Sequence, residues 1–533
     1  MSGENSIFNA STLTGPEQRH AASEQPTATM LTIAAHPVIS RVGCLCVIQS
    51  SPASKTPTRT TIALSRNEPL FTRPNQLFGQ ALNDPYVSRR PVNIQLLGDG
   101  SVKISALGTN TAVQVQGVPL ANSCILSETE VQEGVTIELA ERVVLLLHWG
   151  VPPYIGESAD LGMVGDSGEI CRVRKEIHRI ADLDVPVLIR GETGTGKELV
   201  ASAIHRTGGR KAQRFVSVNL GALPVSLAAA ELFGSVKGAY TGSQRDQAGY
   251  FKTAHKGVLF LDEIGEALPE IQALLLRVLE TGEILPVGRQ LPFKVDVRLL
   301  AATDANLEER VTGGKFKSPL LHRLAGYEIW VPPLRRRRDD IGRLFVHFAA
   351  EEAAKIGESA RLQNRDPKAP PLIPADRFAR LLRYDWPGNI RQLRNVVRQL
   401  VIDSQGQKSL LFGPKVQHLL NEGPTGRAAS PPEPGNENPK RRPIEIEEAE
   451  LYQAMENHRW EPQKAARALE ISRASIYKLI SAGKRIRLAK DLNRAEISAC
   501  LEQCHGDVNA AAGRLKVSRQ GLLRRMKALS MEH

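Results

Sequence analysis

A glycine-rich segment of the chain has the residue types and spacing that wrap a polyphosphate. Residues 191–197 read GETGTGK, follow the apolar stretch VPVLIR and precede the helical pattern ELVASAIHR. Glycines let backbone N–H groups approach phosphate oxygens, the start of a helix favours anions, and Lys197 reaches the outer phosphates. A chance match in a surface loop is the alternative, but the flanking strand and helix favour nucleotide binding. The ATP-binding residues predicted here are Gly191, Glu192, Thr193, Gly194, Thr195, Gly196, Lys197 and Glu198.

Two adjacent carboxylates follow another apolar strand, about seventy residues after this loop. In GVLFLDEIGE, Asp262 and Glu263 stand where the strand ends. Phosphoryl transfer needs a metal and an oriented water, so we expect Asp262 to hold Mg²⁺ through water and Glu263 to polarise the attacking water. A solvated turn is the alternative. Glu198 replaces the usual Ser or Thr of such a loop, so Mg²⁺ coordination must depend on another group and on waters.

The elements that must position these residues alternate between strand and helix. From about residue 158 to 330, apolar strands such as RFVSVNL and VRLLAATD alternate with helical patterns, which predicts an α/β domain with a mainly parallel sheet. Residues 331–420 have helical patterns only and predict a smaller helical subdomain. The stretch 421–443 is rich in Pro, Gly, Asn and Glu, which is typical of a flexible linker.

The N-terminal part of the chain has a different texture. Residues 1–38 are rich in Ser, Thr, Ala, Gln and Pro without periodicity, which predicts a disordered tail. Residues 39–150 contain short β-branched stretches such as VNIQLL, SVKIS and VTIEL, separated by Gly, Asn and Pro. This pattern predicts an all-β sandwich.

The C-terminal part carries much of the chain's positive charge. The whole chain of 533 residues has 69 Lys and Arg against 57 Asp and Glu, a net charge of +12. From residue 440 onward there are 19 basic and 12 acidic residues, so more than half of the excess lies there. Such an asymmetry favours an anionic partner, and we expect nucleic acid at this end.

A repeat with a period of 46 residues lies in the same region. Ala465-Ala466 and Ser472-Arg473 of the first copy recur as Ala511-Ala512 and Ser518-Arg519. Small residues let two helices pack closely, and a second helix opening with Ser-Arg can present its N-terminal face to the major groove. We therefore predict two helix-turn-helix units, at 444–490 and 491–533, and a helical dimerisation module is the alternative.

Cysteine usage and hydropathy bear on location. The six cysteines are scattered without CxxC spacing, so they indicate neither a zinc site nor a disulfide framework. No signal peptide pattern is present, and no apolar run approaches the ~20 residues that cross a bilayer. We expect a soluble, cytoplasmic protein with no membrane partner.

Several motifs in a fixed order carry a family resemblance from Gly165 to about Leu400. GETGTGKE, ELFGSVKGAYTGS, GVLFLDEIGE, AATDANLEE, FKSPLLHRL, VPPLRRRRDDI and WPGNIRQL resemble the central domain of sigma-54-dependent transcription activators, which are AAA+ ATPases. The resemblance implies a homo-oligomeric ring, expected to be a hexamer, that hydrolyses ATP to open promoters for RNA polymerase carrying sigma-54. ATP and Mg²⁺ are the implied cofactors.

A loop that reads GAFTGA in the family contacts the sigma factor. Here it has Ser as its last residue in place of Ala, and outside this context it would be read as an ordinary hairpin turn. The implied contact residues are Gly238, Ala239, Tyr240, Thr241, Gly242 and Ser243.

Other roles follow from position in the family motifs. Asn219 corresponds to the residue that switches the catalytic Glu263 between poses. Thr303 and Asp304 stand where the family senses the γ-phosphate, usually as Thr-Asn, and Arg391 resembles the sensor of the helical lid.

Lys317 and Arg323 occupy the arginine-finger positions, which act on the nucleotide of a neighbouring subunit. An ammonium cannot give the bidentate fork of a guanidinium, so we expect hydrolysis to depend mainly on Arg323. Either residue alone would more often be a surface charge.

The two terminal regions also resemble known modules. Both C-terminal units resemble Fis-type helix-turn-helix domains, which implies contacts with upstream double-stranded DNA from Arg473, Ser475, Tyr477, Lys478, Arg519, Gln520, Arg524 and Arg525. The β region resembles a forkhead-associated (FHA) domain through Leu64-Ser65-Arg66, Val87-Ser88-Arg89, Thr109-Asn110 and Gln116-Gly117. This implies binding of a phosphothreonine protein through Arg66, Ser88, Arg89 and Asn110.

Two departures weaken the FHA resemblance: Pro91 replaces a motif His, and Gln116 replaces an Asn. A sandwich that only packs on the motor is the alternative for this region.

Two other functions remain open for the whole chain. One is an AAA+ remodeller that does not act on sigma-54, which the GAYTGS loop argues against. The other is a DNA-binding repressor or scaffold with a degraded ATPase, which Lys317, Asp304 and Ser243 keep open.

Overall fold

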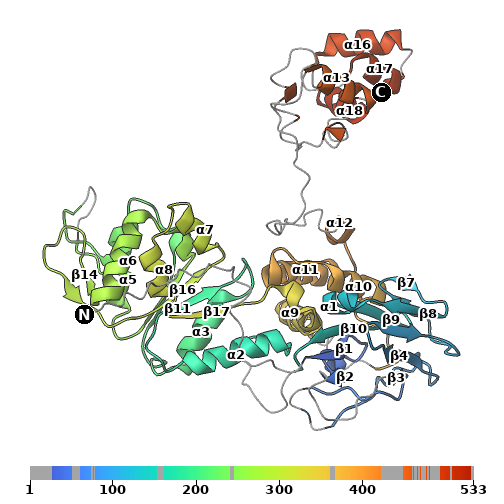
Figure 1. The fold of residues 1–533 in the computed structure, drawn as a ribbon, viewed down its shortest axis with the longest axis horizontal. Helices are drawn as coiled ribbons and strands as arrows, with labels where there is room; N and C mark the ends of the chain where they lie inside the picture. The colour runs from blue at the N-terminus through green and yellow to red at the C-terminus, as the bar shows by residue number, and fades with distance from the viewer. Residues whose placement is uncertain are drawn as a thin grey trace, which may run out of the picture. The chain divides into compact units, whose positions relative to one another are not determined.

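The structure is a computed structural model of the 533-residue chain. It describes residues 27–50, 61–73, 76, 78–152, 161–239, 245–359, 366–407, 409–421, 448–458, 460, 465, 468–469, 476, 479–480, 492–504 and 507–529. The chain divides into two compact units, Met1–Thr425 and Gly426–His533. Figure 1 shows the β-rich, α/β and helical parts of the first unit and the helices of the second.

The N-terminal part of the first unit is a sandwich of two antiparallel sheets. One sheet has the order β2-β1-β10-β9-β6-β7 and the other β3-β4-β5-β8. Side chains of both sheets, such as Ile33, Ile94 and Leu145, form one buried core. A short helix, α1 (Glu128–Glu133), begins with a capping box formed by Ser127 and Glu130. The strands are β1 (Ala28–Ala35), β2 (Leu45–Ser50), β3 (Thr61–Leu64), β4 (Val92–Leu96), β5 (Val102–Ser105), β6 (Val113–Val115), β7 (Val118–Pro119), β8 (Ser123–Leu126), β9 (Val135–Leu139) and β10 (Val143–Gly150).

Strand β1 lies inside the segment that the sequence indicated as a disordered tail. It pairs with β10 on one side and β2 on the other, and seven of its eight residues are buried. A central strand covered on both faces does not alternate apolar and polar residues, so ATMLTIAA lacks the period of two that marks a half-buried strand. The boundary at residue 38 is therefore wrong, and the sandwich includes residues from Ala28 onward.

The α/β part has a parallel five-stranded sheet in the order β12-β13-β16-β11-β17. Its strands are β11 (Val187–Arg190), β12 (Phe215–Asn219), β13 (Val258–Asp262), β16 (Arg298–Thr303) and β17 (Tyr327–Trp330). Ile189 and Phe260 pack with α2 (Gly168–Ile180) and α3 (Lys197–Thr207), whereas Leu188 and Leu261 pack with the helices of the other face. Those helices are α4 (Ala228–Phe233), α5 (Tyr250–Thr253), α6 (Pro269–Thr281) and α8 (Ser318–Leu324). Because both faces are covered, the strands are continuous apolar runs.

Three small elements complete this part: α7 (Leu307–Thr312) follows β16, and a hairpin of β14 (Glu283–Ile284) and β15 (Phe293–Lys294) follows α6. All five large strands end in the same direction. The loops after β11, β13 and β16 therefore meet at one edge of the sheet, which is where ligands bind in open α/β folds.

The helical subdomain comprises α9 (Ile341–Lys355), α10 (Ala375–Arg383), α11 (Asn389–Asp403) and α12 (Pro414–Asn421). Its core includes Phe345, Phe378 and Trp386, and it also takes in Ala34 and Val144 of the β sandwich. A Cβ added to Gly342 of α9 would lie 2.3 Å from the carbonyl oxygen of Ala34, so α9 and β1 are in direct contact. The sandwich and the helical subdomain thus share one apolar core.

The second unit holds two small helical cores. One core contains Leu451 and Met455 of α13 (Glu448–Asn457) together with Trp460 and Ile476. The other is formed by α16 (Arg494–Gln503), α17 (Val508–Arg514) and α18 (Arg519–Ala528). Across the described part of the whole chain, no helix is both long and apolar enough to span a bilayer.

Candidate functional site

The glycine-rich loop leaves strand β11 and ends at the first turn of α3. Gly194 and Gly196 have φ angles of 80° and 101°, which L side chains rarely adopt. Gly196 is the N-cap of α3 and gives no side-chain cap, so the helix start stays open to an anion. The loop therefore has the backbone shape of a phosphate cradle.

Lys197 lies inside this cradle. Its Nζ donates hydrogen bonds to the carbonyl oxygens of Gly191 at 2.7 Å and Glu192 at 3.2 Å. Burial lowers the pKa of Lys197, and the nearby carboxylates of Asp304, Asp262 and Glu263 act in the opposite direction. The structure thus places the two carboxylates predicted from GVLFLDEIGE beside the predicted phosphate-binding lysine.

Asp262 and Glu263 come directly after β13. The Oδ1 atom of Asp262 accepts from the backbone N–H of Glu263 at 3.0 Å, and Glu263 has a φ of 56°. Asn219, at the end of β12, is in register with Asp262, and its Oδ1 accepts from the N–H of Ala222 at 3.2 Å. A Cβ added to Gly221 would lie 2.3 Å from Oε2 of Glu263 and 3.3 Å from Oδ1 of Asn219. Asn219 and Glu263 therefore face the same glycine.

Thr303 and Asp304 lie at the end of the neighbouring strand β16. The N–H of Gly191 donates to the carbonyl oxygen of Thr303 at 3.2 Å, and the Thr193 hydroxyl donates to the Asp304 carboxylate. The Thr303 hydroxyl is buried and accepts from the N–H of Ala305 at 3.0 Å. Both predicted sensor residues thus contact or adjoin the loop.

An apolar cavity adjoins the phosphate loop on the side of the helical subdomain. Its wall is shared by the segment before α2, the loop itself, α3 and the helical subdomain, and it is lined by Gly162, Met163, Val164, Ile170, Thr195, Gly196, Leu199, Val200, Val331, Arg337, Leu344, His347, Phe348 and Ile390. A flat, largely apolar ligand group such as a nucleobase suits this lining, and we call this cavity the base cavity. Met163 and Val164 were not among the predicted site residues, because a short apolar stretch before a helix has no chemical signature of its own.

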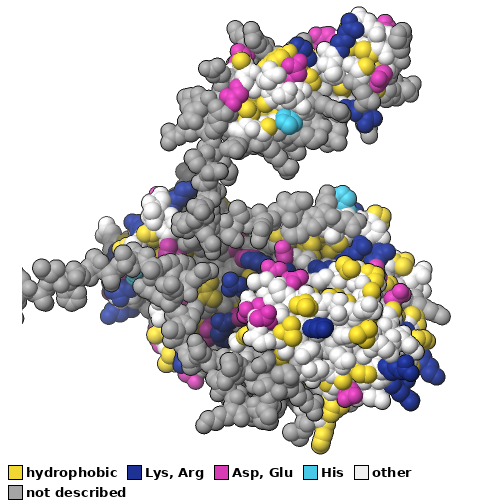
Figure 2. All heavy atoms as spheres, turned by 45° about the vertical axis from the view of Figure 1, so that its right-hand side comes forward, with side chains coloured by type: hydrophobic (Ala, Val, Ile, Leu, Met, Phe, Trp, Pro, Cys, Tyr) yellow, Lys and Arg dark blue, Asp and Glu magenta, His cyan; other side chains and the backbone are white. Residues whose placement is uncertain are grey.

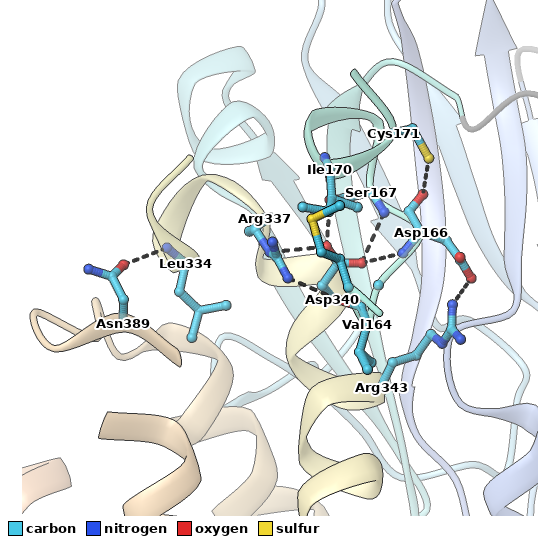
Figure 3. Close-up of polar contacts among 12 residues, drawn as sticks. Val164, Asp166, Ser167, Ile170, Cys171, Leu334, Arg337, Asp340, Arg343 and Asn389 are labelled. Atoms are coloured by element: carbon cyan, nitrogen blue, oxygen red, sulfur yellow. Dashed lines mark hydrogen bonds and ion pairs between the residues drawn. The ribbon is translucent and has the colours of Figure 1, made fainter. Parts of the chain in front are cut away.

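The connection between the α/β part and the helical subdomain is fixed by Asp340. Its carboxylate accepts from the N–H groups of Asp166 and Ser167 at 2.6 and 2.9 Å, and from the Ser167 hydroxyl at 2.5 Å. Arg337 pairs with Asp340 at 3.2 Å and donates to the carbonyl oxygen of Val164, which lines the cavity. Figure 3 shows this cluster and the ion pair of Arg343 with Asp166. The motif RRRRDDI therefore joins the segment before α2 to the helical subdomain at the wall of the cavity, which its charge pattern alone did not reveal.

The remaining charged residues of the motor predictions are exposed. Arg391 is the third residue of α11, and its backbone N–H donates to the carbonyl oxygen of Gly194 at 3.3 Å. Lys317 occupies the N-cap position of α8, where its side chain makes no capping hydrogen bond. Arg323 lies near the C-terminal end of that helix, and 59% of its side chain is exposed. Arg391 thus adjoins the loop of its own chain, whereas Lys317 and Arg323 are accessible to another molecule.

Only the base of the GAYTGS loop is described. Gly238 and Ala239 are described, while Tyr240, Thr241, Gly242 and Ser243 lie outside the described residues. The two described ends of the loop are joined by an isolated bridge between Ser235 and Gln247, and the N–H of Lys237 donates to Asp246 at 2.8 Å. The described residues on either side of the loop are thus held together.

Three of the four FHA-like segments meet at one end of the sandwich. The N–H of Arg66 donates to the carbonyl oxygen of Ser88, and the N–H of Ser88 donates to the hydroxyl of Thr111. Arg89 and Asn110 are exposed at this end. The Arg66 guanidinium donates to the carbonyl oxygens of Val87 and Pro85, so it braces the loop that carries Ser88.

The fourth segment, Gln116-Gly117, lies elsewhere. It forms the turn between β6 and β7, where a Cβ on Gly117 would approach the guanidinium of Arg383 in α10 to 3.2 Å. It therefore faces the helical subdomain and takes no part in the cluster of Arg66 and Ser88.

Figure 2 shows that apolar, basic and acidic side chains are interspersed over the visible surface of the first unit.

The predicted DNA contacts are described only in part. Arg473, Ser475, Tyr477 and Lys478 lie outside the described residues, and the side chains of Gln520 and Arg524 are not described. Arg519 is exposed at the start of α18, as a groove-reading residue must be. The Nε of Arg525 donates to the carbonyl oxygen of Leu492 at 2.9 Å, which gives this side chain a structural bond. Ala511 and Ala512 are buried between the helices, as the close packing of this motif requires.

Comparison with known proteins places these features in a family. Models of the sigma-54 interaction domain, the AAA+ ATPase lid domain and the Fis family of bacterial regulatory proteins match residues 163–330, 335–412 and 489–529. The transcriptional regulator NtrC of Escherichia coli strain K12 is 37% identical over 377 residues, which are 71% of each chain. The chain belongs to the sigma-54-dependent transcriptional activators.

Other relatives in this family are similar over a shorter stretch. The hydrogenase transcriptional regulatory protein HoxA of Cupriavidus necator is 41% identical, covering 56% of this chain and 60% of the relative. The anaerobic nitric oxide reductase regulator NorR of Citrobacter koseri is 40% identical, covering 60% and 62%. Among solved structures, NtrX of Brucella abortus in complex with ADP is similar with a TM-score of 0.45, 28% identity and 70% of each chain covered. The matches to the three family models show that the activator has the sigma-54 interaction, lid and Fis-type modules of its family.

Proposed function

We propose that this activator hydrolyses ATP to remodel the closed complex of sigma-54 RNA polymerase and open promoters. The observation that carries the proposal is the meeting of Lys197, Asp262, Glu263 and Asp304 at one phosphate cradle, within the segment that matches the sigma-54 interaction domain. A structural loop would not need a lysine and three carboxylates beside a helix start that is open to anions.

In the proposed site each residue acts on ATP through its own atoms. The backbone N–H groups of 191–197 and the Lys197 ammonium bind the phosphates, and Glu263 orients the attacking water. Asp262 and waters would hold Mg²⁺, which supplies charge neutralisation on the phosphates when bound. One oxygen of Asp262 is engaged by the N–H of Glu263, which fixes the carboxylate for that task. Thr303 and Asp304 sense the γ-phosphate, and Asn219 positions Glu263.

The proposed assembly is a homo-oligomeric ring, with six subunits as the expected number. The exposed Arg323, and to a smaller degree Lys317, would reach the phosphates bound by a neighbouring subunit. The loop 238–243 would carry the nucleotide state to sigma-54, and its braced base at Ser235 and Gln247 supports this transmission. The C-terminal helix-turn-helix units would hold the ring on DNA upstream of the promoter.

The test is a transcription assay with purified sigma-54 polymerase and a supercoiled template, run beside an ATPase assay. Thr241→Ala should abolish promoter opening and leave hydrolysis largely unchanged, because Thr241 is part of the proposed sigma contact and not of the phosphate cradle. Thr281→Ala, at the exposed end of α6, is the matched control and should keep both activities. Promoter opening by Thr241→Ala at the wild-type rate would remove the loop from its proposed role.

We further propose that the β sandwich is an FHA-like module that binds phosphothreonine and regulates the motor. The order of its two sheets, the clustering of residues 66, 88 and 109–111, and the exposed Arg89 support a phosphate-recognition end. The partner proposed for this end is a phosphothreonine protein.

Arg142 supplies a route from this end to the lid. Its Nε pairs with the fully buried Asp84 at 3.1 Å, and its guanidinium lies 4.3 Å from the Tyr86 ring, in the loop that carries Ser88. Its Nη2 donates to the carbonyl oxygens of Pro367 and Ala369 in the lid, both at 2.7 Å. One side chain thus links the loop of Ser88 to the helical subdomain that closes the base cavity.

Calorimetry and ATPase assays on the full chain test this regulation. A phosphothreonine peptide should bind more tightly than its unphosphorylated form and change ATP turnover. Arg142→Lys should keep peptide binding but reduce the change in turnover, because an ammonium cannot bond Asp84 and both lid carbonyls in the same fork geometry. Arg377→Lys on α10 is the matched control. Equal binding of both peptide forms across a broad library would eliminate the phosphopeptide proposal.

A further inference from the structure

The second residue of the phosphate loop is bound by the lid. The carboxylate of Glu192 accepts from both terminal nitrogens of Arg335, at 2.8 and 2.5 Å, and from Nδ2 of Asn389 at 3.1 Å. Arg335 lies just after the α/β part, and Asn389 is the first residue of α11. Three donors from two segments thus meet one carboxylate.

Backbone contacts tie the same two segments together. The fully buried Asn389 also donates from Nδ2 to the carbonyl oxygen of Thr193 at 3.1 Å and accepts from the N–H of Leu334 at 2.8 Å, the bond drawn in Figure 3. A Cβ on Gly194 would lie 2.5 Å from the carbonyl oxygen of Gly388, so the tip of the loop packs directly on the turn before α11. Arg391 lies three residues after Gly388, and its backbone N–H donates to the carbonyl oxygen of Gly194.

This arrangement differs from an ordinary surface ion pair. An exposed pair of lysine or arginine with a carboxylate contributes little to stability, typically about 0–1 kcal/mol. Here the Arg335 fork is bidentate, and a buried amide completes the carboxylate's hydrogen bonds. The Arg335 hydrogen bonds hold the pKa of Glu192 below its usual range, so the carboxylate is charged at neutral pH. The contact therefore orients groups more than it stabilises the fold.

We propose that Glu192 is a positioning residue that latches the lid to the phosphate loop and so sets Arg391 against the bound phosphates. The proposal rests on the proposed ATPase function of the same site. Without the latch the loop would still bind phosphates through its backbone and Lys197, but α11 would be free to move away from Gly194. Arg391 and the lid wall of the base cavity would then be displaced together.

Two measurements distinguish a positioning role from a merely structural one. One is whether a variant changes kcat more than KM, and the other is whether the losses of the Glu192 and Arg335 variants are non-additive. A small misplacement of a group that acts on the transition state lowers the rate by roughly ten- to a hundred-fold. Glu192→Gln should therefore lower kcat of the full chain by about ten-fold or more, with a smaller rise in KM for ATP. Arg335→Gln should have a similar effect, and the double variant should be little worse than either single one, because residues in one network act as a unit.

A matched control is available outside the lid. Arg172 pairs with Glu169 on α2, with side-chain exposures of 52% and 38%, compared with 41% and 41% for Arg335 and Glu192. Glu169→Gln removes an exposed ion pair that touches neither the phosphate loop nor the lid, and it should leave kcat unchanged. Thermal unfolding of each variant separates loss of the latch from loss of the fold.

Two results would overturn the latch. Glu192→Gln with kcat within two-fold of wild type would do so, as would fully additive losses in the double variant. ADP affinity of the same full-length variants gives a second readout that does not need turnover, since loss of the lid wall should weaken ADP binding in Glu192→Gln and not in Glu169→Gln. A wild-type chain that binds ADP but does not hydrolyse ATP would overturn the proposed ATPase, and the latch would then be judged on ADP affinity alone.

Discussion

The Oε2 atom of Glu263 lies directly against Gly221: a Cβ at this glycine would approach that oxygen to 2.3 Å. The backbone of Gly221 does not need a positive φ, so the glycine is required by the carboxylate beside it and not by the turn. The position of the Glu263 carboxylate, which we propose orients the attacking water, is thus set in part by the end of the neighbouring strand β12.

Glu263→Gln should bind nucleotide and hydrolyse it far more slowly. Loss of a positioned base or water-orienting carboxylate typically costs about 100-fold or more in rate. Phosphate release gives the rate, and binding of a fluorescent ADP analogue gives the affinity. Unchanged turnover with normal affinity would mean that another group orients the water.

Gly221→Ala should also slow hydrolysis, because the added methyl group must push the Glu263 carboxylate out of place. The matched control is Gly209→Ala, where the nearest atom to an added Cβ is a side-chain oxygen at an ordinary 3.8 Å. We expect roughly a ten-fold loss of kcat for the first variant and none for the second, with folding checked by circular dichroism. Equal rates for the two variants would show that Glu263 has room to adjust.

Acidification should destabilise the β sandwich through two buried histidines. Burial lowers the pKa of both His36 and His148 to about 4. An unfolded histidine takes up its proton near pH 6.5, so the unfolded state binds more protons than the folded state between about pH 6.5 and 4. The free energy of unfolding should therefore fall as pH falls through this window, by at most about 3 kcal/mol for each histidine.

Urea unfolding at pH 7.5 and pH 5 measures this loss. The pair of substitutions His36→Gln and His148→Gln should reduce the pH dependence, while His178→Gln, at an exposed position of α2, should not. Burial raises the pKa of Glu138, which contributes in the opposite sense, so the comparison between variants matters more than the absolute slope. An identical slope in wild type and in the double variant would exclude these histidines.

Neutralising Arg473 and Lys478 together should weaken DNA binding and flatten its salt dependence. Each phosphate contact that is lost removes roughly one unit from the slope of log K against log salt. Affinity measured at several salt concentrations gives the slope. Lys211→Gln together with Lys415→Gln removes the same two charges from exposed positions outside the C-terminal unit and is the control. A slope that stays at the wild-type value would assign the contacts to other residues.

Chemical signatures with a local context could be predicted from the sequence. The phosphate loop, Asp262 and Glu263 were found because each follows an apolar strand that ends at the same edge of the sheet. Contacts between segments that are distant in the sequence could not be predicted in this way. Nothing in GETGTGKE shows that Glu192 meets Arg335 and Asn389, because side-chain pairing across a hinge depends on how two subdomains dock.

The same contrast between local patterns and contacts of distant segments holds for the β sandwich. Its β class followed from short β-branched stretches, but Asp84 and Arg142 carry no motif and are far apart in the sequence. Their link to the lid arises from the shared core around Ala34 and Val144, which only the folded chain brings together. The segment Gln116-Gly117 matched a motif, yet the fold turns it towards Arg383.

The central place of β1 has a consequence for dissecting this protein into fragments. β1 separates β2 from β10, so a fragment starting at residue 39 would leave β2 and β10 each with an unpaired edge of backbone N–H and C=O groups. Exposed strand edges recruit strands of other molecules, and such a fragment should aggregate or capture a peptide in place of β1. A fragment from residue 27 keeps β2 and β10 paired through β1, so the choice of the first residue decides whether these two edges are free to recruit other strands.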